Sequence, residues 1–223
     1  FSRSSISNKK IRRDLKMETG KIQLNYSNGI NFLLTGVGGQ GTILASNVLA
    51  DLGLALEFDV KKAEIHGMSQ RGGNVISFIR WGKKVFSPII SQGEVDILIA
   101  FEKLEVLRSI DQIRKQGLVL INDYSIVPVT VSSGMGNYPT DEEIKNAVGP
   151  FTSQHYWIKG VKIAEDIGYP KASNVVLLGS LAALTGIDSN IFLKVIANRI
   201  APKYYAFNEQ AFLAGWEAIN EQN

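Results

Sequence analysis

Residues 30–56 of this 223-residue chain are INFLLTGVGGQGTILASNVLADLGLAL, an apolar run followed by glycines and then by a second apolar pattern. A short apolar run directly before glycines is typical of a buried first strand. Beyond the glycines, apolar residues recur every four positions from Leu44 to Leu52, which is the spacing of one face of a helix. The segment therefore predicts a strand over 31–37, a tight turn and a helix over 42–56.

Strand-like and helix-like segments continue to alternate as far as residue 122. Apolar runs of strand length lie at 58–65, 74–81, 85–87, 95–101 and 118–122. Apolar residues on one face predict a helix over 104–116, which Gly117 would end. We therefore expect an α/β fold that is irregular and Rossmann-like. Its mostly parallel sheet would be covered on both faces and would contain a strand-rich insertion after the second strand.

The last hundred residues are expected to be mainly helical. After an irregular segment over 125–139, the predicted elements are helices over 141–148, 161–167, 174–185, 189–200 and 208–220 and a strand over 156–158. Thr140 is a suitable N-cap for the first of these helices. The helix over 174–185 is apolar almost all round, so it should be buried. Gly179 would let a neighbour approach it closely, and Gly186 would end it. These C-terminal helices would cover the sheet or dock on a partner.

The positive charge of the chain is concentrated at its N-terminus. Residues 1–29 carry seven basic and two acidic residues, a net charge of +5, whereas the rest carries 17 basic and 19 acidic residues, a net charge of −2. We expect residues 1–28 to be a disordered tail, or one foreign to the natural protein, and residues 29–223 to be a single domain. A nucleic-acid-binding domain would carry its positive charge on the folded surface, so no nucleic-acid partner is expected.

Composition excludes several other classes of protein. The sequence contains no cysteine, so it offers no disulfide, no thiolate-ligated zinc and none of the usual ligands of an iron–sulfur cluster. His66 and His155 are its two histidines and lie far apart in the sequence, so no metal site is expected. No run of eighteen apolar residues predicts a membrane helix, and nothing at the N-terminal end of this sequence has the apolar core of a secretory signal. A cytoplasmic protein without a membrane partner is therefore expected.

The glycines after the first strand form the first candidate site. Three of them have the G-x-G-x-x-G spacing between a predicted strand and a predicted helix, where backbone amides and the helix N-terminus favour an anion. The candidate residues are Gly36, Gly38, Gly39, Gln40 and Gly41. Glu64 stands about where a dinucleotide-binding protein has its ribose-binding acid. Three interpretations remain open: a dinucleotide site, a tight turn without a ligand, and a loop that faces a phosphate or a partner.

The loop 66–73, HGMSQRGG, is the second candidate site. Its candidate residues are His66, Ser69, Gln70, Arg71, Gly72 and Gly73. The guanidinium of Arg71 is a planar fork of donors that matches a carboxylate or a phosphate. Since the loop follows the second strand, it should emerge at the same carboxyl edge of the sheet as the glycine turn, where ligands collect in open α/β sheets. The alternative is a surface hairpin whose arginine lies in water.

Other polar and aromatic residues are weaker candidates. Glu102 and Asp123 follow apolar strands and could orient a substrate, but capping or surface roles are the favoured interpretation of both. Tyr204, Tyr205 and Phe207 are expected to serve in packing or in an interface rather than as a stacking platform for bases. No nucleophile stands beside a base, so the sequence gives no support to a hydrolase.

Several of these motifs together resemble one known family. The turn GVGGQG, the loop end QRGG, the pair Ser87-Pro88 and the strand before Glu102 resemble, in this order, the gamma domain of 2-oxoacid:ferredoxin oxidoreductases. The segment 64–73 is most similar to the beta subunit of indolepyruvate:ferredoxin oxidoreductases. The resemblance extends over about residues 30–220, including the stretch 171–184.

The resemblance implies a role in the oxidative decarboxylation of a 2-oxoacid, with indolepyruvate or another aryl pyruvate as substrate. The products would be an acyl-coenzyme A, carbon dioxide and reduced ferredoxin. A large partner subunit would hold the thiamine diphosphate and the iron–sulfur clusters. This chain would be the subunit without clusters, and it would be inactive alone. It lacks cysteine and the Gly-Asp-Gly signature of thiamine-diphosphate domains, which agrees with that division of labour.

At the shared interface, the two glycine-rich loops would face a phosphate-bearing ligand such as coenzyme A, or the partner. Arg71 would hold an anion there, with His66 as a weaker candidate. Two other hypotheses remain open at this stage. One is a stand-alone nucleotide-binding oxidoreductase that uses the glycine turn, and the other is a non-catalytic scaffold with this fold.

Overall fold

The computed structural model describes residues 29–67 and 73–221, which contain a mixed six-stranded sheet. The strands are β1 (Ile30–Val37), β2 (Asp59–His66), β3 (Asn74–Gly82), β4 (Val95–Ala100), β5 (Ile113–Asn122) and β6 (His155–Ile158). Their order is β2-β3-β1-β4-β5-β6. Strands β1, β4, β5 and β6 are parallel, whereas β3 is antiparallel to both of its neighbours, β1 and β2. The predicted α/β fold with a strand-rich insertion is thereby confirmed, and β3 is the inserted strand.

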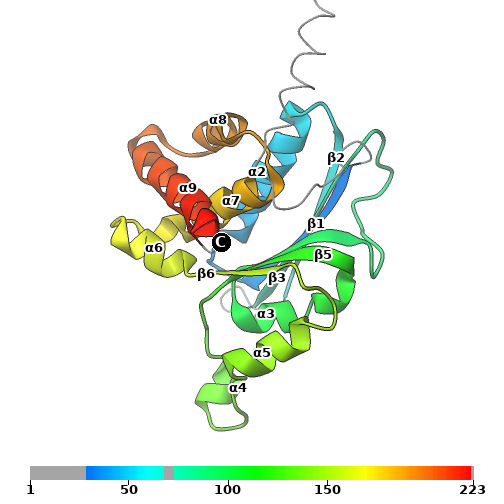
Figure 1. Ribbon diagram of the computed structural model, residues 1–223, viewed down its shortest axis with the longest axis vertical. Helices are drawn as coiled ribbons and strands as arrows, with labels where there is room; N and C mark the ends of the chain where they lie inside the picture. The colour runs from blue at the N-terminus through cyan, green and yellow to red at the C-terminus, as the bar shows by residue number, and fades with distance from the viewer. Residues whose placement is uncertain (1–28, 68–72, 222–223) are drawn as a thin grey trace, which may run out of the picture.

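Helices cover the two faces of the sheet unequally (Figure 1). They are α2 (Thr42–Ala55), α3 (Lys103–Leu107), α4 (Val129–Ser132), α5 (Asp141–Val148), α6 (Gly160–Asp166), α7 (Ser173–Thr185), α8 (Ser189–Arg199) and α9 (Tyr205–Asn220). The larger core lies between the sheet and the layer that contains α2, α7 and α9. A smaller core lies under α3 and α5 on the opposite face. No helix among the described residues has the length and apolar character needed to cross a membrane.

Helices α7 and α9 pack with almost no space between their backbones. A Cβ atom built on Gly179 of α7 would lie 1.8 Å from the carbonyl oxygen of Phe212, and one built on Gly215 of α9 would lie 1.9 Å from that of Val176. The predicted role of Gly179 in a close approach is therefore confirmed. The predicted end of α7 is confirmed as well, because Gly186 has a left-handed φ of 67° at its C-cap.

The helix predicted over 104–116 is wrong in its second half. Helix α3 ends at Leu107, and Ile113 already belongs to β5, where it pairs with Val95 next to an irregularity in the register. Gln116 has a left-handed φ of 60°, and Gly117 packs so tightly against Ile113 that a Cβ would lie 2.5 Å from Ile113 Cγ1. A bulged strand therefore buries residues whose spacing also suits a helix.

The strand predicted over 85–87 is also wrong. Residues 83–94 form a loop, and side chains rather than a neighbouring strand make hydrogen bonds to several of its backbone groups. The amide of Val85 donates to Asp59 Oδ2 at 2.8 Å, and Arg80 donates to the carbonyls of Ser87 and Ile89 at 3.3 and 2.9 Å. The other predicted elements are confirmed to within a few residues. The largest difference is at β5, which begins five residues before the predicted strand over 118–122, and α9 begins three residues earlier than predicted, at Tyr205.

Candidate functional site

The glycine turn and the described ends of the second loop lie together at the carboxyl edge of β1. The amide of Gly38 donates to the carbonyl of Gly73 at 3.0 Å, and the amide of Gly67 donates to Asn74 at 2.8 Å, which closes the β2–β3 hairpin. The strand register aligns His66 with Val75, and Val75 with Gly36 at the end of β1. The two loops are therefore neighbours, as expected, although β2 reaches this edge as part of a hairpin and not beside β1.

Two glycines of the turn have backbone conformations that other residues rarely adopt. Gly39 has φ 99° and is exposed, and a Cβ on it would meet nothing within 4 Å. Gly41 has φ 78° at the N-cap of α2, where a Cβ would lie 2.3 Å from Asn174 Nδ2. The side-chain amide of Asn174 donates from Nδ2 to the backbone carbonyl of Gly41 at 3.1 Å. A side chain at position 41 would therefore collide with Asn174 of α7, whereas the space beside Gly39 is free of other atoms of the described chain.

Gln40 holds the turn from within. Its Oε1 accepts from the amide of Val37 at 2.7 Å, and its Nε2 donates to the carbonyl of Phe101 at 2.9 Å. Gln40 also explains why residue 36 is a glycine, because a Cβ on Gly36 would lie 2.9 Å from Gln40 Oε1. The polar side chain inside the turn is therefore a structural part of it.

The N-terminus of α2 presents free backbone amides and no negative charge. No side chain caps it, and its first turn contains no acidic residue. Two buried oxygens beside the turn, Thr42 Oγ1 and Asn174 Oδ1, have no hydrogen-bond partner in the part of the chain that the structure describes. An uncapped helix N-terminus favours an anion through its amides and its dipole.

Glu64 does not serve as a ribose-binding acid. Strand β3 separates β2 from β1, and the Glu64 carboxylate accepts from Ser46 Oγ at 3.0 Å and pairs with Lys62 Nζ at 2.8 Å. Burial raises the pKa of Glu64, but the hydrogen bonds from Lys62 and Ser46 outweigh it and lower the pKa overall. His66 Nε2 lies 3.6 Å from the same carboxylate. The structure therefore lacks the strand arrangement of a dinucleotide site.

Glu102 and Asp123 have structural roles. Glu102 is buried and caps α3 through the amides of Leu104 and Glu105 at 2.7 and 3.1 Å. Asp123 pairs with Lys103 Nζ at 3.3 Å. The capping alternative weighed for Glu102 in the sequence is thereby confirmed.

Sequence reasoning missed Lys103 and Tyr138, which hold the segment after β5. Lys103 Nζ also pairs with Asp141 at 2.5 Å. Burial lowers the pKa of Lys103, but its bonds to Asp141 and Asp123 outweigh burial and raise the pKa. Burial, and then the hydrogen bond to Glu102, raise the pKa of the Tyr138 hydroxyl. Lys103 and Tyr138 are therefore anchoring residues whose charge states do not change near neutral pH.

The remaining candidates divide into those that the structure places and those that it does not. Ser69, Gln70, Arg71 and Gly72 lie outside the described residues, as does the predicted tail over 1–28. Tyr204 and Phe207 both stack on Tyr169, with ring centroids 5.3 and 5.4 Å apart, which agrees with packing. No group of three His, Asp or Glu side chains within 29–67 and 73–221 could hold a metal ion.

Comparison with known proteins places the chain in a family. The family model for pyruvate ferredoxin/flavodoxin oxidoreductase matches residues 31–218. The chain belongs to this family. Indolepyruvate oxidoreductase subunit IorB from Pyrococcus horikoshii is 38% identical to it over 194 residues, which are 86% of this chain and 96% of the relative.

Two solved structures share the fold of this family member. Pyruvate oxidoreductase subunit PORC from Thermotoga maritima matches with a TM-score of 0.65 at 21% identity, over 85% of this chain and 96% of that one. The 2-oxoglutarate:ferredoxin oxidoreductase from Magnetococcus marinus, with 2-oxoglutarate, coenzyme A and succinyl-CoA bound, matches with a TM-score of 0.66 at 20% identity. The match covers 87% of this chain but only 31% of the Magnetococcus chain. The same fold thus occurs both as a separate chain and as one part of a longer one.

Proposed function

We propose that this chain is the small, cluster-free subunit of a thiamine-diphosphate-dependent 2-oxoacid:ferredoxin oxidoreductase. Its substrate would be indolepyruvate or another aryl pyruvate, which the complex decarboxylates and oxidises to an acyl-coenzyme A while electrons pass to ferredoxin. The relationship to subunits named indolepyruvate oxidoreductase supports this substrate class. Residues 29–223 would form a single domain, and the complex would work in the cytoplasm.

The residues of this chain do not fit the redox cofactors of such an enzyme. The sequence supplies no cysteine thiolate for a cluster, and it has no Gly-Asp-Gly signature for thiamine diphosphate. Both groups would therefore be held by a larger partner subunit, and the chain alone would be inactive. When bound there, thiamine diphosphate would supply the carbanion chemistry of decarboxylation.

The contribution of this chain would be an anion-binding surface at the catalytic interface. The observation that supports it is the contact between Gly38 and Gly73, which joins both glycine-rich loops at the uncapped N-terminus of α2. Backbone amides at such a point suit the phosphates of coenzyme A. Arg71 stands between Gly67 and Gly73 in the sequence, and its guanidinium would hold the substrate carboxylate, a coenzyme A phosphate or an acidic residue of the partner.

The test is reconstitution. The chain is produced alone and also co-expressed with the cognate large subunit, and ferredoxin reduction by indolepyruvate and coenzyme A is measured for each sample. We expect the isolated chain to be colourless, iron-free and inactive, and the complex to co-purify and to reduce ferredoxin. Stoichiometric iron in the isolated chain, or thiamine diphosphate binding to it at micromolar concentration, would contradict the proposal.

A further inference from the structure

A stretch of sixteen residues after β5 is both uncharged and uncovered. Residues 124–139, YSIVPVTVSSGMGNYP, which we call the arm, contain no acidic or basic side chain. No residue of the arm is fully buried, and Val127, Val129 and Met135 are 52%, 80% and 74% exposed. Large apolar side chains that are exposed within one short uncharged segment are typical of an interaction site. The arm is therefore a candidate interaction surface.

The arm is nevertheless held in one shape. Helix α4 lies within it, and the amides of Met135 and Gly134 donate to Thr130 and Val131 at 2.9 and 3.0 Å. Both ends are anchored by Glu102, whose carboxylate accepts from the amide of Ile126 at 3.0 Å and from the hydroxyl of Tyr138. A surface that is ordered before it binds loses less conformational entropy when it binds.

Three consecutive residues connect the arm to the glycine turn. The carbonyl of Phe101 accepts from Gln40 of the turn at 2.9 Å. The next residue, Glu102, anchors the arm, and the amide of Lys103 donates to the carbonyl of Tyr124 at 3.1 Å. The arm and the turn are therefore linked through one short segment at the carboxyl edge of the sheet, which places the start of the arm near the surface that the partner is proposed to cover.

We propose that the arm docks into an uncharged, apolar groove of the large catalytic subunit, an inference that rests on the proposed function. A charged groove would have to lose its hydration on contact with the arm without gaining an ion pair. A lipid surface is a poor match, because the arm offers no lysine or arginine to the headgroups.

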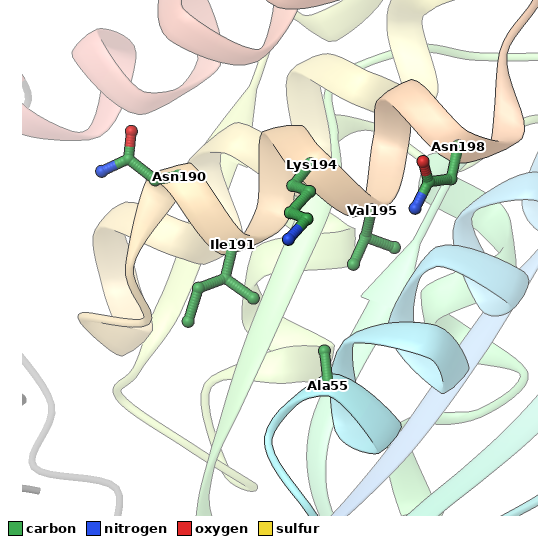
Figure 2. Close-up of a pocket in the computed structure, with 6 residues that line it drawn as sticks. All are labelled: Ala55, Asn190, Ile191, Lys194, Val195 and Asn198. Carbon is green, nitrogen blue, oxygen red and sulfur yellow. The ribbon is translucent and has the colours of Figure 1, made fainter. Parts of the chain in front are cut away.

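The hollow between α2 and α8 of a second copy is also a poor match for the arm. The hollow between α2 and α8 contains Lys194, Asn190 and Asn198 beside its apolar residues, as Figure 2 shows. It also lies at the opposite end of the molecule from α4 (Figure 1). A contact between the arm of one copy and this hollow of the next would be head-to-tail, whereas most dimers of identical chains use a two-fold contact.

The experiment measures binding of the full chain to the separately purified cognate large subunit by isothermal titration calorimetry. The variants are Val129→Asp, Met135→Asp and the double variant. The matched control is Phe86→Asp, since Phe86 is 85% exposed in the loop 83–94, which leaves β3 at the edge of the sheet opposite the carboxyl end of β1. We expect the double variant to weaken binding by roughly 10²-fold or more and the control to change it by less than about threefold. Thermal unfolding of all the variants should match that of the wild type.

The possible failures are distinguishable. If the wild-type chain does not bind the large subunit, the proposed function fails and the inference fails with it. If the wild type binds and the double variant binds equally tightly, only the inference is overturned. Equal loss in the Phe86→Asp control would also overturn it, because the effect would not be specific to the arm. An isolated wild-type chain that sediments as a dimer, with a monomeric double variant, would assign the arm to a second copy and overturn the inference.

Discussion

The side-chain amides of Gln40 and Asn122 donate to the same carbonyl oxygen, that of Phe101, at 2.9 and 3.1 Å. Gln40 belongs to the turn after β1, Phe101 follows β4 and Asn122 ends β5. Asn122 Oδ1 also accepts from the amide of Gly160 at 3.0 Å, which fixes the start of α6. One backbone oxygen therefore joins the ends of three parallel strands, and the glycine turn is held to the sheet by polar contacts.

The variant Gln40→Leu should measurably destabilise the fold. It removes the acceptor of the Val37 amide, and a buried amide without a partner costs about 1–3 kcal/mol. We expect the free energy of unfolding in urea to fall by about that amount. The control is Gln92→Leu, because Gln92 is exposed and donates to Asp111, so its loss should change stability by about 0.5 kcal/mol or less. Equal stability of the two variants would show that Gln40 does not support the turn.

We expect the largest loss of stability from a substitution at the contact between α7 and α9. In Gly179→Ala the new methyl group would collide with the carbonyl oxygen of Phe212, and neither helix backbone can move without opening the core. We expect a loss of about 3 kcal/mol or more in thermal or urea unfolding. Gly136→Ala is the control, since a Cβ there meets nothing within 4 Å and its φ is not positive. It should be neutral, or stabilising by about 0.4–1 kcal/mol.

The sequence predicted the features that depend on local spacing. The strand and helix around the glycine turn, the Thr140 cap and the buried α7 all follow from residues within a few positions of one another. The β5 bulge could not be predicted from the local spacing, because apolar residues such as Leu107 and Ile113 suit the buried face of a helix as well as that of a strand. Only the pairing of Ile113 with Val95 decides between them.

The contacts that shape the candidate site also join residues that lie far apart in the sequence. Asn174 bonds to Gly41 across 133 positions, and Tyr138 bonds to Glu102 across 36. No periodicity encodes such pairs, so Asn174 and Tyr138 could not be singled out in advance. A cue for the arm was present in the sequence, since sixteen uncharged residues stand together there, but only the structure shows that none of them is fully buried.

Tyr138 predicts a change of stability in alkaline solution. Burial and the Glu102 carboxylate raise its pKa above the ordinary value of 10.0, so above that pH the unfolded chain loses the phenolic proton while the folded chain keeps it. The folded state is then the one that binds more protons, and its stability falls as pH rises. We expect the stability advantage of the wild type over Tyr138→Phe to be constant below about pH 9. Above about pH 10 it should shrink by up to about 1.4 kcal/mol per pH unit. A constant difference up to pH 11.5 in urea titrations would contradict this.

Arg71 predicts a loss of catalysis without a loss of folding. If its guanidinium holds an anion at the shared site, Arg71→Ala should lower kcat/KM for ferredoxin reduction by roughly 10²-fold, and Arg71→Lys should already be impaired because it loses the planar fork. Arg199→Ala is the control, since Arg199 pairs with Asp51 on the surface between α8 and α2. Wild-type kinetics in an intact Arg71→Ala complex would identify a solvated hairpin arginine instead.

Substitutions of Gly39 and Gly41, the two glycines of the turn with positive φ, should have different effects on folding and on function. In Gly41→Ala the methyl group would be forced into Asn174, which is 1% exposed, so strain and collision together should lower stability by about 2–4 kcal/mol. Gly39→Ala has the strain of φ 99° but no collision within the chain, so it should cost about 1–3 kcal/mol and leave a folded subunit.

If a phosphate or a partner backbone approaches Gly39, the folded Gly39→Ala variant should still lose at least about tenfold in the coenzyme A-dependent rate or in binding to the large subunit. Stability is measured by urea unfolding, and function by ferredoxin reduction in the reconstituted complex. A Gly39→Ala complex that assembles and turns over like the wild type would show that the glycine turn is open only to water.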